Sequence, residues 1–248
     1  MKTIYILWLR QLKRHYRSKS RVLGSIAQPM LFLLSLGFGF NSIFAKAGAG
    51  DYINFLTPGI IGMTLIFTSI FSGMEIIWDR QFGFLKEILV APVSRLNIMI
   101  GRTLGGASVA VLQGIFIYFM AMLVGFRPVS WYALPAIIGV MLLISLLFTA
   151  LGTMVASRMK DMHGFQLVMN FLVMPLFFLS GALFPLDGLP TALSLVASAN
   201  PLSYGVDALR QLIIGTGYYG LGLDLIVLSA CCALFLFLGA YSFKTMEA

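Results

Sequence analysis

The side chains that could carry catalysis in this sequence are few and lie far apart. Cys231 and Cys232 are adjacent inside an apolar run, and His15 and His163 are separated by more than half of the chain. Neither pair has the spacing of a metal site, a disulfide framework or a nucleophile with its base. The sequence also lacks a phosphate-binding loop, a G-x-S-x-G elbow, an H-E-x-x-H motif and clustered carboxylates. We therefore expect no catalytic residue, no metal and no cofactor in this chain.

Charged side chains that could form an ion or proton route are nearly missing from the long apolar runs. Each charge at the centre of a bilayer costs about 2.5–3.5 kcal/mol on insertion scales, so such residues mark transport routes. Glu75, Arg102 and Asp224 lie near the ends of apolar runs, where we expect water or lipid headgroups to reach them. The polar residues further in, such as Gln113 and Asn170, are uncharged. A chain of this kind that moves a substrate must draw its energy from another subunit.

The composition requires a surface that faces lipid. The 248 residues are 59% hydrophobic and 10% charged, whereas a soluble domain carries about 25% charged residues. The formal net charge of +8 does not indicate a nucleic-acid partner, because the basic residues lie between long apolar runs. Charge in this pattern indicates membrane topology.

Six apolar runs are long enough to cross a bilayer as helices, which takes about 20 residues. They cover residues 22–44, 55–78, 101–125, 132–157, 165–184 and 221–243. The runs are continuously apolar, which favours helices over the alternating strands of a barrel. The sequence thus predicts an all-α polytopic membrane protein with a single transmembrane domain, residues 1–248.

The distribution of Lys and Arg predicts the orientation of these spans. With the amino terminus in the cytoplasm, 14 of the 17 basic residues fall on inner segments, and Lys46, Arg127 and Arg210 fall on outer ones. The positive-inside rule then places both termini in the cytoplasm and the chain in the cytoplasmic (inner) membrane. A signal peptide cleaved near Ala45 or Ala47 is the competing interpretation, but the preceding apolar run exceeds the usual length of about 7–15 residues.

Residues 3–19 are predicted to form a helix that lies in the membrane interface and contacts anionic lipid headgroups. One face would carry apolar and aromatic side chains, and the basic residues would point elsewhere. The apolar face consists of Tyr5, Trp8, Leu9, Leu12 and Tyr16, and the basic residues are Arg10, Lys13, Arg14 and Arg17. The alternative is a basic flank that only sets the topology.

Residues 79–95, between the second and third spans, are too charged to insert and too apolar for a plain loop. Gly83 and Pro92 bound a short predicted helix whose apolar stripe consists of Phe84, Leu85, Ile88 and Leu89. Something must cover this stripe in the cytoplasm. The pattern leaves two interpretations open, a docking partner and a helix that folds back onto the membrane surface.

The long outer segment 187–216 contains two apolar pieces, 190–197 and 202–214, that are too short to span the bilayer. They are predicted to form a re-entrant hairpin that enters and leaves on the same side. Asn200 is placed to cap the second piece. Asp207 and Arg210 are three residues apart, and we expect them to pair on the surface of that helix.

Two stretches of the chain resemble the permease subunits of type-2 ATP-binding-cassette (ABC) exporters, a family that includes drug-resistance, nodulation-factor and polysaccharide exporters. Residues 80–95 are similar to the coupling-helix segment of that family, and Asn200-Pro201-Leu202-Ser203-Tyr204 with Asp207 and Arg210 is similar to its late signature. The order of interfacial helix, six spans, coupling segment and outer hairpin extends the likeness over the whole chain. Many relatives have Glu where this chain has Gln81, so a salt bridge at that position is not expected here.

The resemblance implies a permease homodimer that binds two copies of a cytoplasmic ABC ATPase, which would hold the ATP and Mg. The substrate would be hydrophobic or amphiphilic: a drug, a lipid or a lipid-linked glycan. The implied ATPase-coupling residues are Glu75, Arg80, Gln81, Gly83, Phe84, Leu85, Glu87, Ile88, Leu89 and Pro92. The first, second and fifth spans would line the pathway, with Phe32, Phe67, Phe71, Phe171 and Phe177 among its wall residues. Each Phe could equally face lipid or pack a helix, and Gly37, Gly59 and Gly62 would allow close helix approach.

Two other function classes compete with this interpretation. An ion-coupled secondary transporter is the main alternative, because each half has three spans and the second and fifth contain Pro58 and Pro175, a possible trace of inverted repeats. Pro58 opens its span whereas Pro175 lies mid-span, and no buried ion site is apparent. A membrane-embedded enzyme is the third class, and it would lack any recognisable catalytic constellation.

Overall fold

The computed structural model describes residues 2–46, 51–83, 93–188 and 190–244, and this part of the chain is helical with no strand. The helices are α1 (Lys2–Arg17), α2 (Lys19–Lys46), α3 (Tyr52–Ser72), α4 (Met74–Gln81), α6 (Arg95–Leu123), the 3-10 turn η1 (Trp131–Ala133), α7 (Leu134–Arg158), α8 (Met162–Phe178), α9 (Thr191–Ala199), α10 (Pro201–Ile214) and α11 (Leu221–Lys244). The all-α fold class predicted from the sequence is confirmed for these residues.

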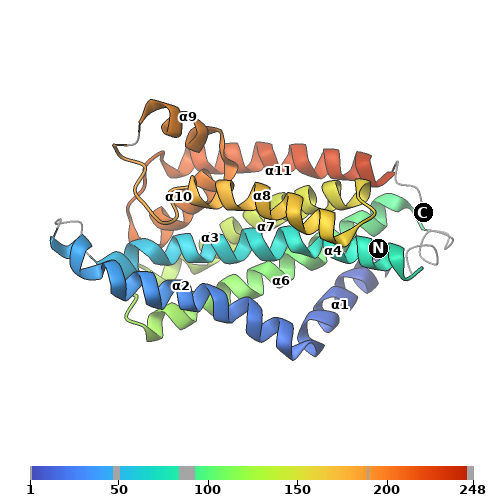
Figure 1. The fold of residues 1–248 in the computed structure, drawn as a ribbon, viewed down its shortest axis with the longest axis horizontal. Helices are drawn as coiled ribbons and strands as arrows, with labels where there is room; N and C mark the ends of the chain where they lie inside the picture. The colour runs from blue at the N-terminus through green and yellow to red at the C-terminus, as the bar shows by residue number, and fades with distance from the viewer. Residues whose placement is uncertain (1, 47–50, 84–92, 189, 245–248) are drawn as a thin grey trace.

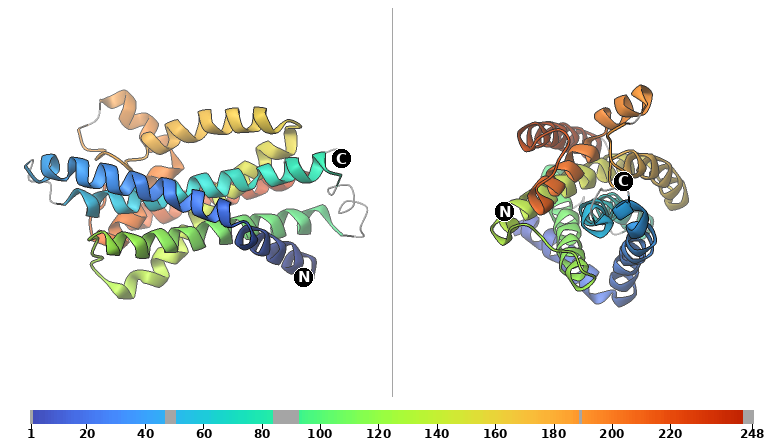
Figure 2. Two further views of the ribbon diagram at one scale, coloured as in Figure 1. Left: turned by 60° about the horizontal axis from the view of Figure 1, so that its bottom comes forward. Right: turned by 90° about the vertical axis from the view of Figure 1, so that its left-hand side faces the viewer.

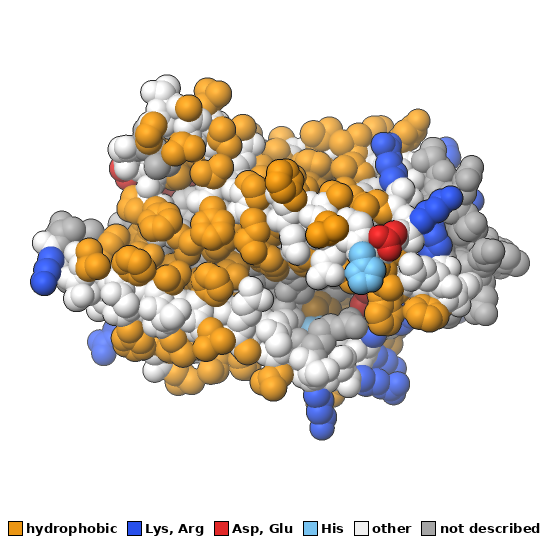
Figure 3. Space-filling view, viewed as in Figure 1, with side chains coloured by type: hydrophobic (Ala, Val, Ile, Leu, Met, Phe, Trp, Pro, Cys, Tyr) orange, Lys and Arg blue, Asp and Glu red, His pale blue; other side chains and the backbone are white. Residues whose placement is uncertain are grey.

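The long helices run side by side along the long axis of the molecule, with α3 packed against α2, α6, α7 and α10 (Figures 1 and 2). One end of the bundle carries α1, α4 and the start of α6, and we name it the α1 end. The opposite end carries α9, the end of α2 and the start of α3, and we name it the α9 end. Hydrophobic side chains cover much of the bundle surface between the ends, and most of the visible Lys and Arg lie at the α1 end (Figure 3).

Five helical segments of the described residues are long and apolar enough to cross a membrane: Val22–Phe44, Tyr52–Gln81, Arg95–Leu123, Trp131–Arg158 and Leu221–Lys244. The second runs through α3 and α4 for 30 residues, or about 45 Å at 1.5 Å per residue. A bilayer core is about 30 Å thick. This segment is therefore longer than the apolar layer is thick.

The predicted fifth span, residues 165–184, is wrong at its carboxyl end. Helix α8 ends at Phe178 after 17 residues, and the chain then turns through Gly181, whose φ of 72° is the left-handed conformation that glycine adopts without strain. The apolar run continues past the turn, which is why composition alone extended the helix. The turn carries Ala182 back against α3.

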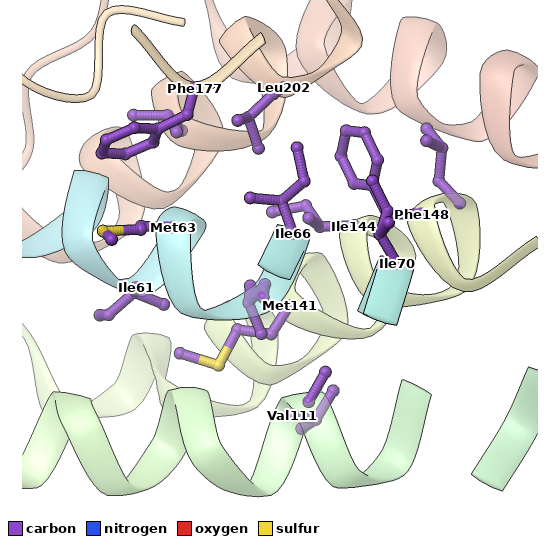
Figure 4. Close-up of a cluster of buried hydrophobic side chains, with 14 of the residues drawn as sticks. Ile61, Met63, Ile66, Ile70, Val111, Met141, Ile144, Phe148, Phe177 and Leu202 are labelled. Atoms are coloured by element: carbon purple, nitrogen blue, oxygen red, sulfur yellow. The ribbon is translucent and has the colours of Figure 1, made fainter. Parts of the chain in front are cut away.

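The core lies where α3, α6, α7, α8 and α10 meet (Figure 4). Ile66 and Ile70 of α3 lie among Phe148 of α7, Phe177 of α8 and Leu202 of α10, all of them buried. Lipid is as apolar as these side chains, so close packing and dispersion hold such helices together in a membrane. The fit between helices therefore decides stability.

Glycines set the closest contacts of α3. An added Cβ at Gly59 would lie 2.1 Å from the Ala182 carbonyl oxygen, and one at Gly62 would lie 2.8 Å from Val206. The predicted close approaches at Gly59, Gly62 and Gly37 are confirmed, since a Cβ at Gly37 would lie 3.0 Å from Ile53. The sequence did not single out Gly152 of α7, where a Cβ would lie 2.5 Å from the Ile70 carbonyl oxygen.

We expect Gly152→Val to destabilise the bundle, because the new side chain would overlap backbone atoms that have no room to move. Overpacking of this kind costs about 1–3 kcal/mol, and we expect the thermal midpoint in detergent to fall by about 5 °C. Gly139→Val is the matched control, since Gly139 lies on the same helix with nothing within 4 Å of its added Cβ. Equal midpoints for the two variants would contradict the close α3–α7 contact.

Candidate functional site

The structure describes only the two flanks of residues 79–95, the segment predicted to couple to an ATPase. Its apolar stripe, Phe84, Leu85, Ile88 and Leu89, lies outside the described residues together with Glu87 and Pro92. On the first flank α4 ends at Gln81, and Gly83 follows with a φ of 78°. On the second flank the Ser94 hydroxyl accepts a hydrogen bond from the Asn97 N–H at 3.2 Å and caps α6. The two helices that meet this segment thus have defined ends.

A buried ionic cluster joins these two helices. Asp79 of α4 is 6% exposed and forms an ion pair with Arg102 of α6, which is 4% exposed. The sequence placed Arg102 and Asp224 where water or headgroups reach them, and this expectation is wrong because both residues are buried. A buried charge without a partner is strongly destabilising, so each residue requires the other.

Two arginines of α1 complete the cluster. Arg10 Nη2 donates to Asp79 Oδ1 at 3.0 Å, and Arg14 Nη1 lies 3.8 Å from the same oxygen. Arg14 Nε also lies 3.7 Å from Glu75 Oε1, and its guanidinium lies 5.8 Å from the centroid of the Trp78 ring. Asp79 therefore holds α1, α4 and α6 together.

Helix α1 packs along α6 through two glycines. An added Cβ at Gly101 or Gly105 would lie 3.0 Å or 2.6 Å from atoms of α1. The Trp8 indole donates to the Ser108 hydroxyl at 2.9 Å. Trp8 is half-buried and its ring lies 5.8 Å from that of Tyr5, whereas Tyr5 and Tyr16 are exposed. The placement of this helix in the membrane interface stays a prediction.

Arg80 and Gln81 fasten α4 to the connection between α7 and α8. Arg80 donates to the carbonyl oxygens of Met159 at 3.0 Å and Ser157 at 3.3 Å, and Gln81 donates to that of Lys160 at 3.3 Å. These contacts lie within the chain. A role for Glu75, Arg80 or Gln81 toward an ATPase stays a prediction.

Asp161 caps α8 in the same connection. Its carboxylate accepts hydrogen bonds from the Gly164 N–H at 2.6 Å and the His163 N–H at 3.3 Å. These bonds, that from Gly164 above all, lower the pKa of Asp161 because they favour the charged carboxylate.

A cavity of about 630 Å³ opens beside the ionic cluster, among α1, α2, α3, α4, α6 and α8. Arg14 and Glu75 lie on its wall, as do the amides of Gln28, Gln166 and Asn170. Phe67 and Phe71 add a stacked aromatic pair with ring centroids 6.2 Å apart. The wall is therefore mostly apolar, with uncharged hydrogen-bonding amides and with the charged side chains of Arg14 and Glu75 on the side of the cluster.

Two of the five predicted pathway phenylalanines line this cavity, Phe67 and Phe71. Phe177 is buried in the core, Phe171 is 84% exposed, and Phe32 packs half-buried against the core. Their assignment to a pathway stays a prediction.

Gln113 of α6 forms a polar junction at the cavity wall. Its amide oxygen accepts from the Thr68 hydroxyl, and its amide nitrogen donates to the Ser25 hydroxyl at 2.7 Å and lies 3.2 Å from His15 Nε2. One uncharged side chain thus links α1, α2, α3 and α6.

The outer-hairpin signature builds the α9 end. Asn200 Oδ1 accepts from the Leu202 N–H at 3.0 Å, which confirms the predicted cap of α10, and its Nδ2 donates to the Leu176 carbonyl at 2.6 Å. Pro201 occupies the first turn of α10, where its missing N–H costs nothing. The Tyr204 hydroxyl donates to the Ser198 carbonyl at 2.8 Å and closes the two helices on each other.

The predicted surface pair of Asp207 and Arg210 is wrong, because both side chains are buried and bind different groups. Asp207 accepts from the backbone N–H groups of Tyr218 and Tyr219 at 2.8 Å and 2.9 Å. Arg210 donates to the Gly181 carbonyl at 2.8 Å and lies 4.1 Å above the Phe55 ring. Burial lowers the pKa of Arg210 to about 10, which keeps the guanidinium charged at neutral pH. The two residues position the loops of the α9 end.

Comparison with known proteins assigns this architecture to a family. Residues 2–214 match the family described as ABC-2 type transporter. The chain belongs to the ABC-2 type transporter family. It is therefore the membrane subunit of an ABC transporter, a multi-pass membrane protein and a transport permease without enzymatic activity of its own.

Individual relatives match most of the ABC-2 permease. Nodulation protein J of Rhizobium leguminosarum bv. viciae is 27% identical over 215 residues, which cover 84% of this chain and 82% of the relative. Two relatives carry the name putative transport permease ycf38. The one from Porphyra purpurea is 30% identical to this chain, and the one from Pyropia yezoensis is 32% identical to it. These matches cover 82% and 79% of this chain and 71% and 69% of the relatives.

Sequence reasoning missed the ionic cluster, above all Asp79 and Arg10. One feature of the sequence could have indicated it. Asp79 follows the second apolar run and Arg102 begins the third, and successive spans joined by a short segment pack antiparallel. Opposite charges at the joined ends of such neighbours are placed to pair.

We expect Asp207→Ala to loosen the α9 end, because the N–H groups of Tyr218 and Tyr219 lose a charged acceptor. The cost is about 2–3 kcal/mol, measured as a lower free energy of unfolding in detergent. The control is Asp187→Ala at an exposed position of the connection between α8 and α9, for which we expect a change within about 0.5 kcal/mol. Equal stability of the two variants would remove the role of Asp207 as a loop anchor.

Proposed function

We propose that this ABC-2 permease exports a hydrophobic or amphiphilic substrate, a drug, a lipid or a lipid-linked glycan, with energy from a separate ABC ATPase. Two permease copies form a homodimer in the cytoplasmic membrane and bind two ATPase subunits, which hold the ATP and Mg. Both termini and the α1 end lie in the cytoplasm, and membrane lipid surrounds the bundle. The observation that carries the proposal is the Asp79 cluster, which fixes both flanks of the segment 84–92.

The placement of buried charge supports an external source of energy. Within the described part of the chain, the buried charged residues are Asp79 and Arg102 at the α1 end and Asp207, Arg210 and Asp224 at the α9 end. Among the described residues, the charged groups with buried side chains thus lie toward the two ends of the bundle, and the buried polar residues between them, such as Gln113, are uncharged. Ion-coupled transporters bind their ion near the bilayer midplane. A permease without such a site depends on work delivered from outside the membrane.

The cavity supports an amphiphilic substrate. It lies among α2, α3 and α8, the helices that correspond to the three spans implied for the pathway. Phe67, Phe71 and Met63 supply apolar surface, whereas Gln28, Gln166 and Asn170 supply hydrogen-bonding groups without net charge. A molecule with an apolar part and an uncharged polar part fits such a wall. The relatives' names, nodulation protein J and ycf38, support transport and do not define this chain's substrate.

We expect Leu85→Asp and Leu89→Asp each to abolish copurification with the partner ABC ATPase, because a charge in the apolar stripe cannot be desolvated against a protein groove. Binding should fall at least tenfold while membrane insertion is unchanged. Lys86→Ala is the control, since Lys86 lies off the predicted stripe. The measurement is the amount of ATPase retained on the purified permease.

Full retention of the ATPase by both aspartate variants would remove the docking role of residues 84–92. Transport by the permease alone in proteoliposomes, run by an ion gradient without nucleotide, would instead favour the ion-coupled class.

A further inference from the structure

We infer that Asp79 is the positioning residue through which movement of the segment 84–92 reaches the substrate cavity. This inference rests on the proposed function, because it assumes that an ATPase moves that segment. Asp79 precedes the segment and Arg102 follows it, 23 positions later in the chain. The ion pair between them joins the two described flanks of this segment, so that α4 and α6 move as one body when the segment is pushed.

The partners of Asp79 differ in exposure. Arg102, whose side chain is 3% exposed, pairs with Oδ2. Arg10 donates to both oxygens, at 3.0 Å to Oδ1 and 3.4 Å to Oδ2, and Arg14 lies 3.8 Å from Oδ1; the side chains of these two arginines are 33% and 26% exposed. A buried ion pair is held far more firmly than a partly solvated one. The Asp79–Arg102 pair is therefore the firmer connection, and the arginines of α1 are the partners that solvent can reach.

Arg14 carries the connection from the cluster to the cavity. Its guanidinium lies 3.8 Å from Asp79 and 3.7 Å from Glu75, and both Arg14 and Glu75 are wall residues of the cavity. The seam of Gly101 and Gly105 holds the other face of α1 against α6. A shift of α4 thus moves α1, and with it one wall of the cavity. In this arrangement the cavity changes shape when the coupling segment moves.

The test removes the ionic contacts between α1 and Asp79 and leaves the buried Asp79–Arg102 pair intact. The variant is Arg10→Gln with Arg14→Gln, which removes two partly exposed charges and leaves Asp79 paired with Arg102. The matched control is Lys13→Gln with Arg17→Gln, which removes two charges from exposed positions of the same helix. Both carry Cys231→Ala and Cys232→Ala, so that a cysteine introduced for Asn170, a cavity residue, is the only thiol.

The readout needs no knowledge of the substrate. In the purified permease–ATPase complex we measure the rate at which a maleimide modifies the cysteine at position 170, without nucleotide and with ATP and vanadate. We expect the nucleotide to change this rate at least fivefold in the parent and in the control. In the Arg10→Gln, Arg14→Gln variant the change should fall below twofold, with ATPase copurification and ATP hydrolysis retained within twofold.

Each other outcome has a defined meaning. A nucleotide response that persists in the Arg10→Gln, Arg14→Gln variant overturns the inference, as does loss of the ATPase from that variant, which would make the cluster a docking element. A parent that binds no ATPase or never responds to nucleotide contradicts the proposed function itself.

A second measurement keeps the inference testable on the permease alone. Spin labels at positions 13 and 82, exposed sites on α1 and after α4, should give one narrow distance in the parent. The distribution should at least double in width in the Arg10→Gln, Arg14→Gln variant and narrow again when lysines replace the glutamines. An unchanged width would show that the arginines do not hold α1 to α4.

Discussion

The structure depends on one constraint: a charge inside a lipid-embedded bundle must be paired there or lie near an end of the bundle. This chain satisfies both conditions at once. Its buried charges gather at the two ends of the bundle, with Asp79 and Arg102 at one end and Asp207 and Arg210 at the other. The middle is left to apolar packing around α3 and to the uncharged junction of Gln113. The ends are therefore where electrostatics fixes the geometry.

The two ends use their charges differently. At the α9 end Asp207 and Arg210 bind backbone groups of neighbouring loops, so the charges hold fixed connections in place. At the α1 end Asp79 binds side chains from two other helices, and part of that cluster borders the cavity. Side-chain pairs between helices can rearrange as the helices shift, whereas a loop anchor resists change. Under the proposed function, this difference suits an α1 end that receives work from the ATPase.

The sequence was sufficient for features that depend on local pattern. Run length predicted the helices, Asn200 predicted its own cap, and Gly59 predicted a close contact. It failed where tertiary packing decides. The apolar run past Phe178 gave no sign of the turn at Gly181, and the spacing of Asp207 and Arg210 suggested a surface pair because nothing local reveals that α10 is buried. The Asp79–Arg102 pair joins residues 23 positions apart, so it depends on how two spans pack. The predicted pathway phenylalanines lie in different environments for the same reason, because composition does not say which face of a helix points inward.

The most direct test of the account is the structure of this permease in lipid nanodiscs together with the ATPase that copurifies with it, determined by electron cryo-microscopy. The account predicts that residues 84–92 form a helix seated on the ATPase at the α1 end, with Asp79 still joining α1, α4 and α6 beside it. Residues 84–92 lying along the membrane surface, with the ATPase bound elsewhere or absent, would contradict it.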